Sequence, residues 1–162
     1  GSLTFGPDGR YTSGSAVLDE QVAQTLALCV NDGMSQSEKL RAGYLYLRDN
    51  CTYLPRAHHP RGSTDWTEES ASFLFANHKG NCYAYAAAFL YMARQLGYDA
   101  QPISGGSGAR DYDHAWVMIG GRIFDPELEY AYLYRVAPSS RHYYDLYDLD
   151  PAASPILYHF PS

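Results

Sequence analysis

The chain is poor in cysteine, in positive charge and in long hydrophobic runs. Its 162 residues include three cysteines and no Cys-x-x-Cys pair, which argues against a disulfide scaffold and against a structural zinc site. Twelve Lys and Arg against 18 Asp and Glu give a net charge of -6, which argues against a protein that tracks nucleic-acid phosphates. The longest apolar run, Tyr83 to Ala93, is too short to span a bilayer, which needs about 20 residues.

The remaining composition is that of one folded domain. The chain is 46% hydrophobic and 19% charged, and its length suits one sizeable core. It begins Gly1-Ser2 without a methionine, which resembles a cloning scar, so we expect a piece of a longer protein. Residues 1–14 are predicted to be this tag remnant and the end of a preceding repeat or linker, with a short hairpin around Pro7-Asp8-Gly9. Residues 15–162 are predicted to form the main domain.

Apolar spacing predicts helices followed by strands. The helices are expected over 17–30, 35–50, 67–78 and 81–97, the second opened by a capping box of Ser35 and Glu38. The last is apolar on nearly every face, which indicates a central buried helix. Strands are expected over 98–103, 114–119 and 122–125, with a flexible loop over 104–113. The segment after Glu127 is expected to add one or two strands and a loose tail. The fold class is therefore α+β.

Cys82 lies in the first turn of the predicted central helix. The free N–H groups and the dipole at a helix N-terminus favour a thiolate, which is the nucleophilic form of cysteine. The same N–H groups can stabilise an oxyanion. The alternative is a small buried core cysteine, which is the commonest fate of a free thiol.

His114 and Asp125 are predicted to lie on one face of a hairpin. If Gly120-Gly121 is a two-residue turn, Ile119 pairs with Arg122 and the two side chains become diagonal neighbours. A carboxylate in that position can orient an imidazole, as in a catalytic triad. A three-residue turn would break this geometry. The alternative is that the two side chains only satisfy each other.

Two segments, GNCYAYAAAFLYMARQLGYDAQPISG and DHAWVMIGGRIFDPELE, resemble the core of the transglutaminase-like superfamily of papain-like thiol enzymes. The resemblance covers about residues 36–130 and includes DNCTYLPR. It implies a papain-like core, in which the cysteine helix packs on an antiparallel sheet that carries His and Asp. It also implies Cys82 as nucleophile, His114 as general base and acid, and Asp125 as the orienting carboxylate. Trp66 matches the tryptophan that helps to hold the oxyanion in transglutaminases, although an ordinary packing role is the alternative.

The N-terminal segment FGPDGRYTSG resembles the end of a cell-wall-binding repeat of Gram-positive surface proteins. That resemblance implies a parent protein that is secreted to the cell surface and bound to wall polysaccharide. The present chain would then be its catalytic module.

These features predict thiol-dependent acyl transfer on amide bonds of a peptide or protein substrate, with hydrolysis as the favoured outcome. The alternatives are protein-glutamine crosslinking and a non-catalytic wall-associated binding module. The chemistry requires neither a metal nor an organic cofactor, and the sequence does not determine the oligomeric state.

Several other polar residues are interpreted as structural. His58 and His59 lie in a proline-flanked loop and are expected to be exposed, and Asp111 and Asp113 are expected in a solvated loop. Cys29 and Cys51 are expected to be unpaired core thiols, because they would lie at opposite ends of their two helices if these pack antiparallel. The tyrosines after Glu127 could form a substrate platform, or their alternation could mark one face of a strand: Tyr130, Tyr132, Tyr134, Tyr143, Tyr144 and Tyr147.

Overall fold

The computed structural model describes residues 3, 5–6, 10–140 and 142–162. Its α-helices are α1 (Ala16–Cys29), α2 (Gln36–Asn50), α3 (Thr67–Asn77), α4 (Cys82–Gln95) and α5 (Pro126–Tyr130). A π-helical turn η1 (Ala131–Arg135) and 3-10 turns η2 (Pro138–Ser140) and η3 (Pro151–Ala153) follow. The strands are β1 (Thr52–Tyr53), β2 (Lys79–Gly80), β3 (Ala100–Ser107), β4 (Tyr112–Ile119), β5 (Arg122–Phe124) and β6 (Tyr158–His159). An antiparallel sheet has the order β5-β4-β3-β6, while β1 and β2 form a parallel pair.

Helices α1 and α2 each begin after a serine whose side chain caps the first turn. Ser15 caps α1, and the Ser35–Glu38 capping box opens α2. These helices, with α3 and α4, confirm the predicted helical segments, and the mixture of helices with an antiparallel sheet confirms the α+β fold class. Among the described residues, no helix is long and apolar enough to cross a membrane.

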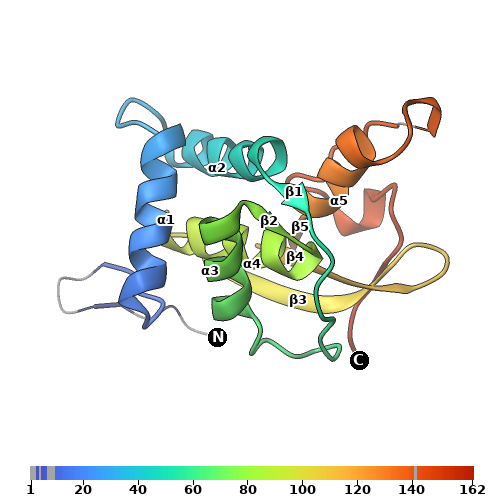
Figure 1. The fold of residues 1–162 in the computed structure, drawn as a ribbon, viewed down its shortest axis with the longest axis horizontal. Helices are drawn as coiled ribbons and strands as arrows, with labels where there is room; N and C mark the ends of the chain where they lie inside the picture. The colour runs from blue at the N-terminus through green and yellow to red at the C-terminus, as the bar shows by residue number, and fades with distance from the viewer. Residues whose placement is uncertain (1–2, 4, 7–9, 141) are drawn as a thin grey trace.

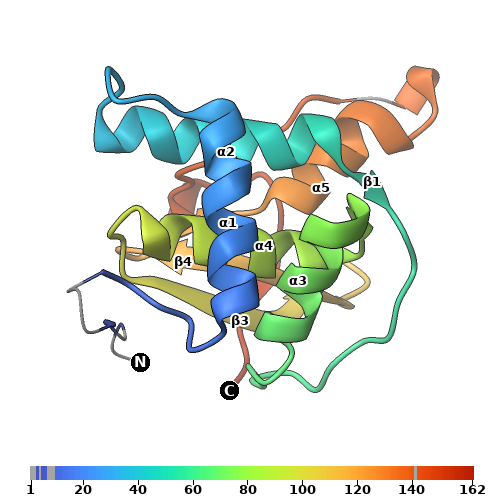
Figure 2. The same ribbon diagram turned by 60° about the vertical axis from the view of Figure 1, so that its left-hand side comes forward.

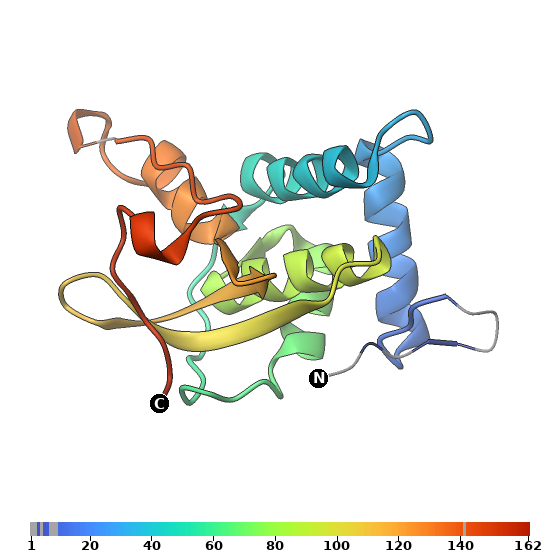
Figure 3. The ribbon, with the colours of Figure 1, turned by 180° about the vertical axis from the view of Figure 1, so that it is seen from behind.

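Helix α4 forms the centre of the core. It lies between α3 and the sheet formed by β3 and β4 (Figure 1). Every side chain from Cys82 to Ala93 is buried, as the all-round apolar pattern predicts. The same arrangement seen from behind shows the long β3–β4 hairpin crossing in front of α4 (Figure 3). The helix that begins at Cys82 is thus held on both sides by the fold.

The β4–β5 hairpin has the predicted two-residue turn. Ile119 pairs with Arg122, and both Gly120 and Gly121 have positive φ angles, of 57° and 77°. Side chains alternate on either side of this register. Ala115 and Val117 of β4 belong to the core around α4, whereas His114 and Trp116 lie on the opposite face of the strand.

The prediction of a flexible loop over 104–113 was wrong. Strand β3 continues to Ser107 and β4 begins at Tyr112, so only residues 108–111 form the turn. The glycines that suggested flexibility are required by close packing. A Cβ on Gly105 would collide with the His159 carbonyl oxygen, and one on Gly106 would lie 2.7 Å from Arg61 Nη2.

The segment after Glu127 begins as a helix, and the strand expected in it lies near the C-terminal end. Asp125 caps α5, Pro126 occupies its first turn, and the helix continues into η1. Tyr130, Tyr132 and Tyr134 therefore do not share one face of a strand. Within residues 126–140 and 142–162 the structure forms only one strand, β6, near the C-terminal end.

Cys29 and Cys51 are unpaired, as predicted, although Cys29 is only half-buried. Their helices do not pack antiparallel, since α1 crosses α2 steeply (Figure 2). At the N-terminal end, Phe5 and Tyr11 form an antiparallel bridge. The predicted turn at Pro7-Asp8-Gly9 and the tag residues Gly1 and Ser2 lie outside the described residues.

Candidate active site

Cys82 is the first residue of α4 and is 6% exposed. Asn81 fixes this helix start: its side-chain oxygen accepts from the Ala84 N–H at 3.4 Å, and its Nδ2 donates to the Arg56 and Ala57 carbonyls at 3.3 Å each. Gly80 brings β2 against the helix, because a Cβ there would overlap the Ala84 side chain. The thiol is thus placed by its local backbone.

His114 and Asp125 form a close buried pair. His114 Nε2 lies 2.7 Å from Asp125 Oδ2, and the two residues are 5% and 0% exposed. The pair joins β4 to the residue that follows β5, as the hairpin register predicts. The sequence therefore placed these two side chains correctly relative to each other.

Asp125 has two further partners. Its Oδ1 accepts from the Leu128 N–H at 3.3 Å, and its Oδ2 accepts from the Tyr158 hydroxyl at 2.7 Å. Tyr158 comes from β6, 33 residues further along the chain. The sequence analysis did not identify Tyr158, and no local pattern around it indicates this contact. Together these contacts fix both oxygens of the carboxylate.

Cys82 and His114 lie near enough for each to shift the pKa of the other. Because Nε2 already faces Asp125, the ring nitrogen left for the thiol is Nδ1. The Ala115 backbone also acts to lower the pKa of the thiol. Strand β5 ends at Phe124, paired with Val117, so the edge of β4 beyond that pair is open at Ala115. The structure thus brings Cys82 close to the His114–Asp125 pair.

The electrostatics of the pair differ from the prediction based on the helix terminus. Burial raises the pKa of the Cys82 thiol, and the hydrogen bonds and charge of His114 only partly oppose this effect. Burial therefore opposes the stabilisation of the thiolate that is expected from the helix N-terminus. Burial also acts to lower the pKa of His114, but the charge and hydrogen bond of Asp125 outweigh it and hold that pKa well above its usual value. The raised pKa of His114 makes the imidazole a stronger base, which helps it to take the proton of a thiol whose own pKa is raised.

Glu127 is a second carboxyl group near this site. It is 6% exposed, and burial raises its pKa to about 7, while the charge of His114 acts in the opposite direction. Its negative charge in turn raises the pKa of Cys82. The sequence analysis assigned Glu127 no role, although it lies only two residues after Asp125.

Trp66 is 2% exposed and its indole N–H donates to the Ser63 carbonyl at 2.8 Å. Its ring packs edge-on against Tyr83, with the ring centroids 5.1 Å apart. The N–H is therefore engaged by the chain itself, which agrees with the packing alternative and gives no support to the oxyanion role.

The loop before Trp66 packs against this site. His59 is half-buried, lying edge-on to Tyr83 and stacked on Trp66, so the prediction that it is exposed was wrong. His58 is exposed, as predicted, and its Nδ1 lies 3.7 Å from Asp113. Arg61 forms ion pairs with Asp111 at 3.0 Å and Asp113 at 2.9 Å. These contacts join the 51–65 loop to the turn between β3 and β4.

Across the described part of the chain, no three His, Cys, Asp or Glu side chains gather in a group that could hold a metal ion.

Comparison with known proteins places the chain in a family. The family model of the transglutaminase-like superfamily matches residues 21–123, a span that includes Cys82 and His114. A structural match is a putative cysteine protease from Cytophaga hutchinsonii, with 19% identity and a TM-score of 0.46 over 89% of this chain. The present chain covers 46% of the length of that protein. No curated protein matches the sequence. Since the family model covers well over half of its length, the chain belongs to the transglutaminase-like superfamily.

Proposed function

We propose that the protein catalyses thiol-dependent acyl transfer from amide bonds, with Cys82, His114 and Asp125 as a catalytic triad and with hydrolysis as the outcome. The observation that carries the proposal is the buried His114–Asp125 pair, with 2.7 Å between Nε2 and Oδ2, beside Cys82 at the start of α4. Family membership supports a thiol-dependent enzyme in general.

The arrangement supports a two-step reaction. His114 takes the thiol proton, and the Cys82 sulfur forms a bond to the amide carbonyl carbon. The resulting oxyanion is stabilised by the Cys82 backbone N–H at the start of α4. The C–N bond then breaks as His114 gives its proton to the leaving amine. In the second step His114 removes a proton from water, the hydroxide attacks the thioester, and the C–S bond breaks to release a carboxylic acid and the thiol.

Asp125 acts throughout by holding the imidazole. Its contact with Nε2 keeps a proton on that nitrogen, so that Nδ1 is free to accept the proton of the Cys82 thiol. The same carboxylate stabilises the imidazolium that this transfer creates. The buried position of both groups strengthens the interaction, because little water competes for it.

The proposed substrate is the amide bond of a peptide or protein at the cell surface or in the cell wall. The location follows from the resemblance of FGPDGRYTSG to the end of a wall-binding repeat. Two other functions fit the same fold. An amine that replaces water in the second step would give crosslinking, and a chain with an unreactive Cys82 would be a binding module.

Alkylation by iodoacetamide tests whether Cys82 is activated. Site-resolved mass spectrometry at several pH values is expected to show Cys82 reacting faster near neutral pH than a free cysteine, and losing that advantage in His114→Ala. Cys51 provides an internal control, since burial raises its pKa to about 12. A Cys82 that reacts no faster than a free thiol would exclude the proposed nucleophile.

A second experiment separates hydrolysis from transfer. The protein is incubated with a glutamine peptide and a fluorescent primary amine. Cleavage of peptides without incorporation of the label supports hydrolysis, provided that it disappears in Cys82→Ala. Incorporation that depends on Cys82 would instead establish crosslinking. No turnover of a broad peptide panel would favour the binding module.

A further inference from the structure

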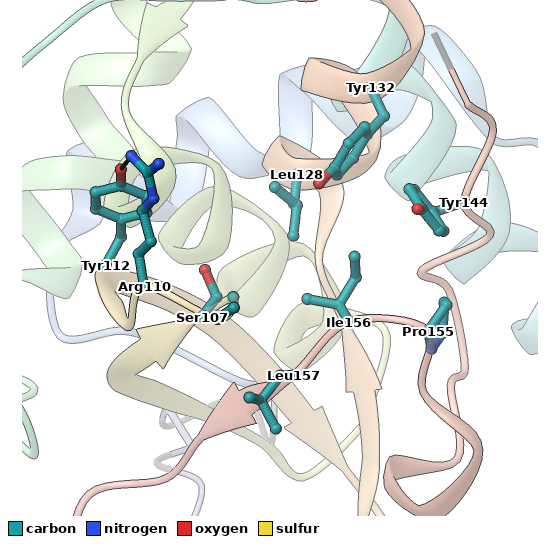
Figure 4. Close-up of a pocket in the computed structure, with 11 residues that line it drawn as sticks. Ser107, Arg110, Tyr112, Leu128, Tyr132, Tyr144, Pro155, Ile156 and Leu157 are labelled. Carbon is teal, nitrogen blue, oxygen red and sulfur yellow. Dashed lines mark hydrogen bonds between the residues drawn. The ribbon is translucent and has the colours of Figure 1, made fainter. Parts of the chain in front are cut away.

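A hollow of about 500 Å³ lies between the end of the β3–β4 hairpin and the C-terminal half of the chain (Figure 4). Figure 4 shows its walls coming from three places: the turn between β3 and β4, the helical segment of α5 and η1, and the C-terminal segment before β6. Most of the side chains that line it are aromatic or aliphatic, namely Tyr112, Leu128, Tyr132, Tyr144, Ile156 and Leu157.

The hollow lies on the same face of the sheet as His114. Tyr112 is two residues before His114 on β4, and alternation along a strand therefore places both side chains on one face. Ser107 also lines the hollow and pairs with both Tyr112 and Tyr158. The floor of the hollow is thus the continuation of the surface that carries the imidazole.

The contacts that hold Asp125 also fix two walls of the hollow. The Leu128 N–H donates to Asp125 Oδ1, and the Leu128 side chain lines the hollow. Leu157 lines it as well and directly precedes Tyr158, whose hydroxyl donates to Asp125 Oδ2. A ligand in the hollow therefore lies close to the triad at a fixed position.

The proposed reaction determines which half of the substrate reaches the hollow. His114 must protonate the nitrogen that leaves, so the leaving half has to pass on the His114 side of Cys82. Tyr112 follows on that side. We propose that the hollow binds an aromatic or large aliphatic side chain in the leaving-amine half of the substrate. This inference rests on the proposed function.

The lining explains this preference. Tyr112 and Leu157 are 62% and 56% exposed, so apolar surface that a ligand could cover is left in contact with water. Among the described residues that line the hollow, only Arg110 is charged, and its Nη1 lies 3.4 Å from the Tyr112 hydroxyl. A cationic side chain would meet this guanidinium, whereas an apolar one would contact the tyrosine and leucine side chains. The volume falls in the range of ordinary ligand sites.

Matched peptides test the specificity. Three substrates differ only at the first residue after the scissile amide, which is Phe, Ala or Lys. The Phe peptide is expected to give a kcat/KM about 10-fold or more above the Ala peptide, with the Lys peptide lowest. Leu157→Ala and Tyr132→Ala are expected to reduce this ratio towards one. Tyr143→Ala is the control, because Tyr143 is an exposed tyrosine outside the hollow and its loss should leave the ratio unchanged.

Equilibrium binding tests the hollow without turnover. Cys82→Ala is titrated with the Phe and Ala peptides, and the Phe peptide is expected to bind about 10-fold more tightly, with the preference lost when Leu157→Ala is added. Preferential binding without turnover by the wild type would support the hollow and overturn the proposed reaction. Turnover with no preference among the peptides would overturn the hollow and leave the reaction standing. Neither binding preference nor turnover would overturn both.

Discussion

The Tyr158 hydroxyl donates to Asp125 Oδ2 at 2.7 Å and thereby joins the C-terminal strand to the carboxylate of the candidate triad. The Tyr158 ring also packs edge-on against Trp116, with a centroid separation of 4.9 Å. The burial of Tyr158, together with the charge of Asp125, raises the pKa of Tyr158 well above its usual value, so the hydroxyl keeps its proton at neutral pH. Tyr158 is therefore a positioning residue that acts through Asp125.

Removing this hydroxyl in Tyr158→Phe is expected to lower kcat/KM about 10-fold. A hydrogen bond to a charged group contributes about 1.5–3 kcal/mol, and its loss leaves the orientation of the Asp125 carboxylate less well fixed. The unshared carboxylate charge should also raise the pKa of His114 further, which NMR titration of the imidazole measures. Tyr143→Phe is the matched control. An unchanged His114 titration with reduced activity would indicate a purely structural role for Tyr158.

Glu127→Gln is expected to change how stability depends on pH. In the folded protein the pKa of Glu127 is raised from 4.5 to about 7. The protonated carboxyl group therefore contributes to stability fully below pH 4.5, and this contribution is lost as the pH rises through 7. Relative to Glu127→Gln, the wild-type free energy of unfolding should fall by about 3 kcal/mol across that window and stay level above it. Urea titrations at pH 4, 6 and 8 test this difference, which should be absent between wild type and Glu69→Gln, where the side chain is 63% exposed.

The same substitution should also alter the thiol. The charge of Glu127 raises the pKa of Cys82, so Glu127→Gln is expected to shift the alkylation profile of Cys82 towards lower pH. Iodoacetamide rates measured over a pH series give the profile directly. A shift in the opposite direction would show that Glu127 acts mainly by stabilising the His114 imidazolium.

Gly105→Ala is expected to displace β6. The new Cβ would meet the His159 carbonyl oxygen and approach the Trp116 ring to 2.9 Å. We expect a loss of about 1–3 kcal/mol in the free energy of unfolding and faster hydrogen exchange at the Gly108 N–H, which donates to the Leu157 carbonyl. In Gly33→Ala the nearest atom is Asn31 Oδ1, a side-chain atom that can move, so this control should cost little. Equal effects in the two variants would refute the close-packing argument.

Arg48→Leu is expected to destabilise the fold by about 3 kcal/mol. Arg48 Nη1 lies 2.7 Å from Glu129 Oε2, and Glu129 is fully buried, so the substitution leaves a buried carboxylate without its cation. Arg122→Leu removes an exposed pair with Asp148 and should cost less than about 1 kcal/mol. Thermal and urea unfolding of both variants provide the comparison. A similar small loss in each would show that Glu129 is adequately held by the Tyr44 hydroxyl and the Leu146 N–H, which donate to its Oε1.

The parts of the site that depend on short-range rules could be predicted. Gly120-Gly121 readily adopts the positive φ angles of a two-residue turn, and this turn sets the register that places His114 beside Asp125. Asn81 and the apolar run after it start a buried helix at Cys82. Each of these features is determined within a few residues of chain.

Other features depend on contacts between distant segments. A glycine that makes a loop flexible and a glycine that lets two strands approach look alike in a sequence, and Gly105 and Gly106 are of the second kind. Nothing near Tyr158 indicates that its hydroxyl reaches Asp125. The pKa of Cys82 is likewise set by its burial, which sequence position at a helix start does not reveal. The helical start at Asp125-Pro126, by contrast, had a capping signal that could have been used.

The position of β6 also sets the order in which the site can be assembled. Helix α4 and the β3–β5 strands are close in sequence, so their contacts form at a small cost in loop entropy. The bond from Tyr158 to Asp125 must close a separation of 33 residues and requires β3 to be in place already. The contact of His114 with Asp125 closes only 11 residues, so during refolding this pair should form before Tyr158 reaches the carboxylate. Thiol reactivity of the native type should return more slowly than helical circular dichroism.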